Sequence, residues 1–388
     1  MQREAAGRVV QQMVEASYPD NYQPEYEDKI ALHDAIHELH ITDAVTTPRD
    51  VDAVTHKLSQ LVEGGQQGPL LIIGNCNESV EAKTPIATLR ERMQSLLGVV
   101  ACSTVGDNAL TVLRGFGQSN KPRSKQHETL ADGSRVESYM GDMVNGRAEH
   151  DRSPDPTRMV ATALQARDVA ADLTTALGNH VPAAHETLLL PYEESFIRTD
   201  LKTGKDYLLS ADIPWIGLRT NTPEGEHVKL LARVENPVGI KIGAGTTAEH
   251  IKQLSTILNP DAAPGKLILM LRLGLDKHAE LPELLEAIGA HARGSVLMYD
   301  IHGATKTRAD GAKLRLVDDI VEEITLLSQA CETAGLRLHG LHLEAMSDDA
   351  RNECADTPDQ NLDDGNIDPQ LNPRQLAYVL DNTAHCFA

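Results

Sequence analysis

Cationic side chains recur in this sequence where a small anion could be bound. Arginine makes planar, paired contacts to carboxylate and phosphate groups, and lysine supplies a compact point charge. One group of cations lies in the segment RGFGQSNKPRS, which contains Arg114, Lys121 and Arg123 with Ser124. Three single cations follow it in the sequence: Arg219 in WIGLRT, Lys241 in NPVGIKIG and Arg272 in LILMLRLG.

The surroundings of these cations indicate what they bind. A cation buried among apolar residues is costly unless it is paired. Lys241 and Arg272 each lie within a strongly apolar segment, which favours a shared anionic partner such as a ligand. For residues 114–124 taken alone, a solvated basic loop is the competing interpretation.

Short apolar runs position most of these residues. Eight such runs follow Gly68, separated by longer helical or loop segments: 69–76, 110–118, 185–193, 213–219, 237–243, 266–274, 295–303 and 336–344. Most runs end near a residue type that serves in active sites: Cys76, Arg114, Glu193, Arg219, Lys241, Arg272, His302 and Glu344.

The pattern of the runs predicts the fold class. Several runs are apolar on both faces, as parallel strands are, and helix-like segments alternate with them. Eight such units predict a closed (β/α)₈ TIM barrel, with an open doubly wound sheet as the alternative. Barrel enzymes carry their active sites at the carboxyl ends of the strands, so these residues would meet at one mouth. For any single residue, a solvent-facing charge is the alternative.

The amino-terminal part differs from the rest. Residues 1–65 are polar and helix-like, and residues 48–65 begin on a proline and end on glycines, which is typical of a helix. We therefore expect a helical extension over residues 1–65 and a catalytic barrel over residues 66–388.

Bulk composition narrows the functional class. The formal net charge of −21 argues against a nucleic-acid surface but allows a small anionic substrate. No signal peptide and no apolar run of membrane-spanning length (roughly 20 residues) is evident. The five cysteines are odd in number and scattered, which is typical of reduced thiols in a cytoplasmic protein.

An ordered set of motifs identifies a family. The segments KPRS, YMGDMVNG, HETLLLPYE, WIGLRT, NPVGIKIG, HGATKT, LHLE and DPQLN follow one another along most of the chain. In this order they resemble the motifs of class II 3-deoxy-D-arabino-heptulosonate 7-phosphate (DAHP) synthases. The resemblance implies a (β/α)₈ barrel and the condensation of phosphoenolpyruvate with erythrose 4-phosphate. It also implies a divalent metal, Mn²⁺ or Co²⁺, and a homodimer or homotetramer.

The resemblance also implies roles for individual residues. The metal ligands would be Cys76, His302, Glu344 and Asp368. Phosphoenolpyruvate would be held by Arg114, Arg219, Lys241 and Arg272. Lys121 would lie near the reacting carbon, as a candidate proton donor. The phosphate of the acceptor aldose would be held by Arg123 and Ser124, and Lys313 matches a family lysine that follows the metal histidine.

The sequence departs from the family pattern around that histidine. Leu218 replaces the usual glutamate before Arg219, Asp300 is one position closer to His302 than the family aspartate, and Ala304 replaces an asparagine. These changes leave open an aldolase of the same type with a different phosphorylated aldehyde, for example an amino or imino analogue. An inactive barrel that serves as a scaffold is a third reading.

The spacing between two motifs has a further implication. Only about 38 residues separate YMGDMVNG from HETLLL, whereas larger members of the family carry an inserted helical pair there that is associated with regulation by aromatic amino acids. We therefore expect a short form of the enzyme without this insert, similar to members that serve secondary metabolism.

Overall fold

The computed structural model describes most of the chain. The described residues are 23–65, 68–75, 84–106, 108–117, 119–120, 127–130, 132–308, 311–358, 360, 362 and 368–387. Among them, no helix combines the length and the apolar character that crossing a membrane requires. Of the helical extension expected over residues 1–65, residues 1–22 lie outside the described residues.

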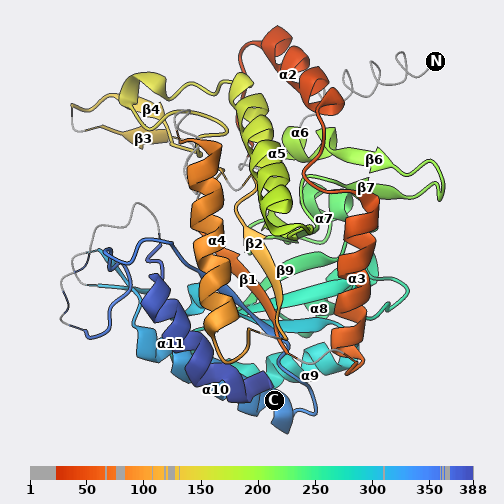
Figure 1. Ribbon diagram of the computed structural model, residues 1–388, viewed down its shortest axis with the longest axis vertical. Helices are drawn as coiled ribbons and strands as arrows, with labels where there is room; N and C mark the ends of the chain where they lie inside the picture. Colours follow the sequence, from red (N-terminus) through yellow and green to blue (C-terminus); the bar gives the residue numbers. More distant parts are fainter. Residues whose placement is uncertain are drawn as a thin grey trace.

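Eight parallel strands form a closed barrel, which confirms the expected fold (Figure 1). Around the ring they follow the order β1-β14-β11-β10-β9-β8-β5-β2, and β2 pairs with β1 to close it. Their bounds are Leu70–Gly74 (β1), Leu110–Arg114 (β2), Ala183–Glu186 (β5), Ile213–Ile216 (β8), Val238–Gly243 (β9), Leu267–Arg272 (β10), Val296–Asp300 (β11) and Gly340–Glu344 (β14).

Helices surround the barrel (Figure 1). Their bounds are Lys29–Ile41 (α2), Pro48–Val62 (α3), Ile86–Cys102 (α4), Thr157–Leu177 (α5), Leu190–Ser195 (α6), Glu226–Leu231 (α7), Ala248–Leu258 (α8), Leu281–His291 (α9), Val317–Thr333 (α10) and Pro373–Thr383 (α11). Three short hairpins project from the loops: His127–Thr129 with Arg135–Glu137 (β3–β4), Ile197–Thr199 with Asp206–Leu208 (β6–β7), and Lys306–Thr307 with Lys313–Leu314 (β12–β13).

Alternation along each strand separates two apolar layers. In β1, Leu70 and Ile72 belong to the cluster inside the barrel, whereas Leu71 and Ile73 pack against the surrounding helices. This is the period of two expected of a strand that is buried on both faces. Trp215 of β8 also lies inside, and Gly239 makes room for it, because a Cβ atom there would lie 2.7 Å from the Cβ atom of Trp215.

Helix α3 closes the amino-terminal end of the barrel. It begins at the proline expected from the sequence, with Thr47 accepting a hydrogen bond from the backbone N–H of Asp50. Its apolar face packs into the interior cluster through Val54, Leu58 and Leu61. The buried face of α2 belongs to the outer layer near α5 and α6 (Figure 1). The division of the chain at residues 65 and 66 stays a prediction.

The expected strand over residues 185–193 is wrong in its placement. The strand in this region is β5, which ends at Glu186, and the apolar residues after Thr187 lead into the short helix α6. Helix α6 is buried on almost every side and carries a proline in its first turn, so its apolar run resembles a buried strand. Glu193 therefore does not end a strand: it lies in α6 and contacts His185 at 2.9 Å.

Candidate active site and metal centre

The carboxyl ends of the strands bring distant charged residues together inside the barrel. Arg114 shares the inward side of β2 with Val112, and Glu344 shares that of β14 with His342. Lys241 and Arg272 lie on the inward sides of β9 and β10, which are adjacent strands. The carboxyl-terminal mouth of the barrel therefore holds both cations and carboxylates.

Three side chains at this mouth could hold a metal ion. His302, Glu344 and Asp368 offer ligand atoms that lie within 4.8 Å of one another. Nε2 of His302 is 2.8 Å from Oε1 of Glu344 and 4.0 Å from Oδ2 of Asp368. His302 sits in the one-turn 3-10 helix Ile301–Ala304 that follows β11. The fourth expected ligand, Cys76, lies outside the described residues.

The electrostatics of this group fit a cation. Burial opposes the protonated form of His302, but the carboxylates of Asp300 and Glu344 outweigh it and raise the pKa of His302 to about 10. Burial also opposes ionisation of Glu344, yet His302, Arg315 and Arg114 hold the pKa of Glu344 well below its ordinary range. A positive charge is thus favoured between two carboxylates. The mixed nitrogen and oxygen donors suit a borderline divalent ion.

Arg315 is a site residue that sequence reasoning missed. Its side chain is fully buried, and its Nη1 atom lies 3.1 Å from Oε2 of Glu344. It also donates to the hydroxyl of Thr305 at 2.7 Å and to the carbonyl of Pro369. Arg315 therefore ties the segment that carries Asp368 to the strand that carries Glu344. Its spacing in the sequence gave no signal, because its partners come from three separate segments.

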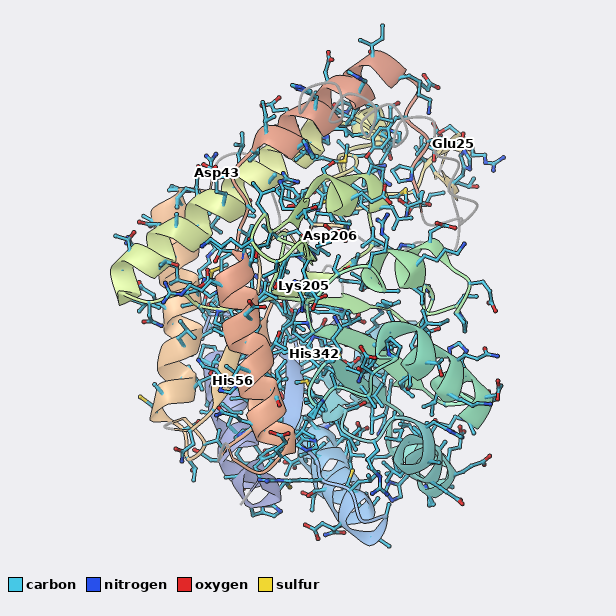
Figure 2. The ribbon with its side chains drawn as sticks, turned by 90° about the vertical axis from the view of Figure 1, so that its right-hand side faces the viewer. Glu25, Asp43, His56, Lys205, Asp206 and His342 are labelled. Carbon is cyan, nitrogen blue, oxygen red and sulfur yellow. The ribbon has the colours of Figure 1, made fainter. Side chains whose placement is uncertain are left out.

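A second buried cluster lies beside the metal candidates. The carboxylate of Asp300 is 2.6 Å from Nδ1 of His302, 3.1 Å from Nζ of Lys241 and 3.3 Å from Nδ1 of His342. The ring of His342 packs edge-on against Trp215, with centroids 5.1 Å apart. Burial, with help from Lys241, lowers the pKa of His342 to about 3, so this ring is neutral. Figure 2 shows His342 deep among the side chains.

The four expected phosphoenolpyruvate ligands differ in their surroundings. Arg114 and Lys241 are buried, and both cations approach the ring of Trp215, at 5.2 and 5.9 Å. Arg272 is half-buried at the end of β10. Arg219 is exposed and lies three residues beyond the end of β8. Strands thus position Arg114, Lys241 and Arg272, whereas a loop positions Arg219.

The expected acceptor site is only partly within the described residues. Lys121, Arg123 and Ser124 lie outside them. Lys313 is half-exposed on β13, where its Nζ atom donates to Oδ1 of Asp368 at 2.6 Å. In this structure, Lys313 therefore contacts an expected metal ligand.

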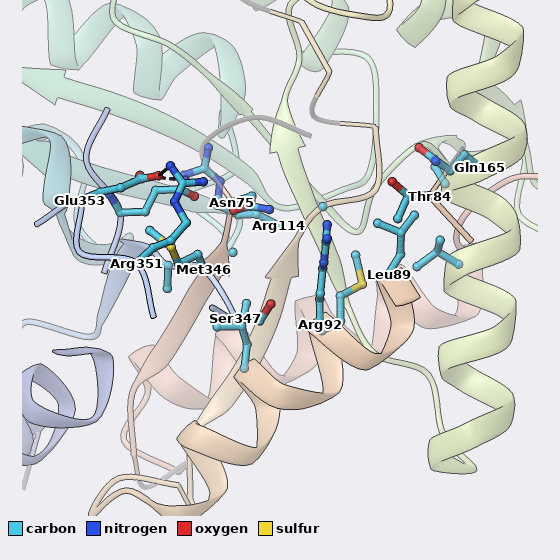
Figure 3. Close-up of a pocket in the computed structure, with 18 of the residues that line it drawn as sticks. Asn75, Thr84, Leu89, Arg92, Arg114, Gln165, Met346, Ser347, Arg351 and Glu353 are labelled. Carbon is cyan, nitrogen blue, oxygen red and sulfur yellow. Dashed lines mark hydrogen bonds and ion pairs between the residues drawn. The ribbon is translucent and has the colours of Figure 1, made fainter. Parts of the chain in front are cut away.

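A pocket of about 250 Å³ opens beside the mouth (Figure 3). It is lined by Gly74, Arg114 and Ala345, at or just after the carboxyl ends of β1, β2 and β14, and by apolar residues of α4 and α5. Figure 3 shows Arg92 rising from α4 into this pocket, with Arg351 on one side. The lining is therefore rich in arginine, although Glu353 pairs with Arg351 at 2.8 Å.

Comparison with known proteins identifies the family. The model of the class-II DAHP synthetase family matches residues 11–181 and 169–380. The chain belongs to the class-II DAHP synthetase family. The resemblance of the motifs is thereby confirmed, and the chain is an enzyme of the DAHP synthase type, a transferase that performs an aldol-type condensation.

Curated relatives match the chain over nearly its whole length. The phospho-2-dehydro-3-deoxyheptonate aldolase of Streptomyces coelicolor is 30% identical, with 93% of this chain and 94% of that protein covered. A probable enzyme of the same name from Pseudomonas fluorescens is 32% identical, with 91% and 92% covered. The solved structure of phospho-2-dehydro-3-deoxyheptonate aldolase from Francisella tularensis covers 90% of this chain with a TM-score of 0.55. Because the two sequences are only 15% identical, this likeness shows a shared fold and nothing about activity.

Proposed function

We propose that this enzyme condenses phosphoenolpyruvate with erythrose 4-phosphate and water to give DAHP and inorganic phosphate. The observation that carries the proposal is the convergence of Arg114 and Lys241 with His302 and Glu344 inside the barrel mouth, with Arg272 at the end of the strand next to that of Lys241. A doubly anionic donor and a metal-assisted carbonyl acceptor need this combination of charges at one place.

The cations would bind and orient the donor. Arg114 and Lys241 flank Trp215, and Arg272 lies one strand further around the ring. Together with Arg219 they would hold the carboxylate and phosphate of phosphoenolpyruvate, so that its C3 carbon faces the aldehyde. C3 would then bond to the aldehyde carbon, water would add at C2, and phosphate would leave.

The metal would be held by His302, Glu344 and Asp368, with Cys76 as the fourth ligand, and Mn²⁺ or Co²⁺ is the proposed ion. When bound, it supplies Lewis-acid polarisation of a carbonyl oxygen. Side chains of the protein orient the ligands and supply the proton. Arg315 fixes the orientation of Glu344, and Lys121 is the proposed proton donor to the new hydroxyl group.

A second candidate acceptor follows from one buried position. Ala304 is fully buried in the turn that carries His302, so this position offers no side-chain hydrogen bond to an aldehyde. The loss of one hydrogen bond changes discrimination more than overall binding. We therefore propose weaker selectivity for erythrose 4-phosphate, or preference for a phosphorylated aldehyde altered near the carbonyl. Arg123, Ser124 and Lys313 are the proposed ligands of its phosphate.

We also propose a cytoplasmic homodimer or homotetramer that serves the shikimate pathway or secondary metabolism derived from it. These assignments rest on the family, on the scattered cysteines and on the compact sequence.

Product analysis tests the proposed function. The metal-stripped protein is incubated with phosphoenolpyruvate and a panel of phosphorylated aldehydes that differ in length and in the C2 substituent, with and without Mn²⁺ or Co²⁺. We expect metal-dependent phosphate release and a seven-carbon product with erythrose 4-phosphate. A kcat/KM profile that favours another aldehyde would select the second candidate. No product with any aldehyde, with or without metal, would overturn the proposed reaction.

A further inference from the structure

The position of Asp300 along its strand determines where its carboxylate lies. In β11, Val296 and Met298 face the inside of the barrel, whereas Leu297 and Tyr299 face the surrounding helices. Asp300 continues the inward series at the last residue of the strand. A carboxylate one position earlier would occupy the place of Tyr299, which faces outward and whose hydroxyl contacts Glu323 of α10.

Inside the barrel, the two oxygens of Asp300 serve two different sites. Oδ1 lies 2.6 Å from Nδ1 of His302, which is a candidate metal ligand. Oδ2 lies 3.1 Å from Nζ of Lys241, which is a candidate ligand of the donor anion. The carboxylate is fully buried, so both interactions are shielded from water. One side chain therefore bridges the metal group and the donor group.

The contact with His302 fixes which nitrogen is available to a metal. A carboxylate accepts a hydrogen bond from Nδ1–H, so the lone pair that a metal ion would use lies on Nε2. Nε2 is the atom that faces Glu344 and Asp368. The backbone N–H of His302 also donates to Oδ1 of Asp300, at 3.2 Å. Asp300 thus sets both the tautomer and the orientation of the ring.

The contact with Lys241 holds the ammonium group where an anion would meet it. Lys241 is a flexible side chain, and a cation that is already held loses less rotational freedom when the anion arrives. The same ammonium group lies 3.2 Å from Nδ1 of His302. A shift of Asp300 toward His302 or toward Lys241 would therefore alter its contact with the other residue.

We propose that Asp300 is a positioning residue that couples donor binding at Lys241 to metal binding at His302. The inference rests on the proposed function for the identity of the two ligands. It predicts that one carboxylate sets the affinity for both ligands, and that each ligand alters the affinity for the other, as linkage requires. A carboxylate that served only to stabilise the barrel would affect folding and leave this coupling intact.

The test uses the full chain with Asp300→Asn, which keeps the shape and removes the charge. Mn²⁺ binding is measured by electron paramagnetic resonance, with and without phosphoenolpyruvate, and phosphoenolpyruvate binding by calorimetry, with and without Mn²⁺. We expect Mn²⁺ binding to weaken by about 10–100-fold, the usual effect of losing an outer partner of a metal histidine. We also expect phosphoenolpyruvate binding to weaken and the mutual effect of the two ligands to disappear.

Asp212→Asn provides the matched control. Asp212 is equally buried, but it lies before β8 at the opposite end of the barrel, where it contacts His180 and Thr46. Its variant should lose stability without losing affinity for either ligand. Unchanged affinities and unchanged coupling in Asp300→Asn would overturn the inference.

A second variant covers a failure to fold. If Asp300→Asn gives no cooperative melting transition, Asp300→Glu decides, because it keeps the charge and displaces both contacts. Weakened binding of both ligands would support the inference, and wild-type binding of both would refute it. Because the readouts are binding and not turnover, a chain that binds both ligands but forms no DAHP would refute the proposed function and leave this inference standing.

Discussion

Arg315 and Glu344 face each other in the interior of the barrel, with Nη1 of the arginine 3.1 Å from Oε2 of the carboxylate and both side chains fully buried. Breaking a buried ion pair by removing one partner leaves an uncompensated charge. Arg315→Met should therefore lower the free energy of unfolding by about 3–5 kcal/mol. It should also weaken metal binding, because Glu344 loses one of the groups that orient it. Urea unfolding and Mn²⁺ titration measure the two effects.

The control for this substitution is Arg374→Met. Arg374 also pairs with a carboxylate at 3.1 Å, that of Asp356, but both side chains are exposed. A pair of that kind contributes about 0–1 kcal/mol. Similar losses of stability in the two variants would contradict the role assigned to burial.

Removal of the donor cations should weaken phosphoenolpyruvate binding. Lys241→Ala and Arg272→Ala should each cost about 2–5 kcal/mol of binding free energy, by analogy with buried charge pairs. Lys241→Ala should have the larger effect, because Lys241 is more deeply buried and contacts Asp300. Calorimetry with phosphoenolpyruvate measures the change. Lys229→Ala, on the exposed surface of α7, is the control, and wild-type affinity in the two site variants would show that these cations serve another purpose.

The stability of the enzyme should depend on pH through Glu323. This carboxylate is buried on α10 and accepts hydrogen bonds from the hydroxyl of Tyr299 and the backbone N–H of Leu275. Burial, with a smaller contribution from Asp319, outweighs these bonds and raises the pKa of Glu323 to about 7. A raised carboxyl pKa contributes stability that is complete below the unfolded value near 4.5 and is lost as pH rises through about 7.

Glu323→Gln should remove this dependence. In the metal-free wild type, the unfolding free energy should decline from pH 5 to pH 8, with a slope of at most about 1.4 kcal/mol per pH unit from this group. The variant should show a flatter profile and be the more stable of the two at pH 8. Glu322→Gln, its exposed neighbour, should leave the profile unchanged. An equal decline in wild type and Glu323→Gln would rule out this group as the cause.

Aromatic amino acids should not inhibit the enzyme. Between Gly146 and β5, where every residue is described, the chain forms one 3-10 turn (Glu149–Asp151) and the single helix α5. Allosteric inhibition needs a second site and two states of different affinity. Steady-state assays with millimolar phenylalanine, tyrosine or tryptophan should therefore match assays without them. Inhibition that is not competitive with either substrate would reveal a site elsewhere.

The sequence predicted the architecture better than it predicted the site. Runs such as those of β9 and β10 are apolar on both faces, and they became strands where expected. The prediction of a strand over LLLPYE failed because residues 188–192, which lead into the short helix α6, are all apolar and buried, so no period distinguishes them from a strand.

Partners that are distant in the sequence explain what was missed at the site. Arg315 and His342 are a charge and a ring buried among groups from other strands, and only the folded barrel shows which groups those are. The departure at Asp300 was visible in the sequence. Its meaning depended on the inward side of β11, which spacing alone did not fix.

The closure of the ring through β1 has a consequence for how the site comes into existence. Strand β1 pairs with β2 and with β14, the last strand of the barrel, so the ring cannot close until Gly340–Glu344 has been made. Glu344, the buried partner of Arg114, comes 230 residues after it in the sequence. At a synthesis rate of about 5–20 residues per second, roughly 10–50 s pass between the synthesis of Arg114 and that of Glu344. The active site therefore forms only after all eight strands of the barrel have been synthesised.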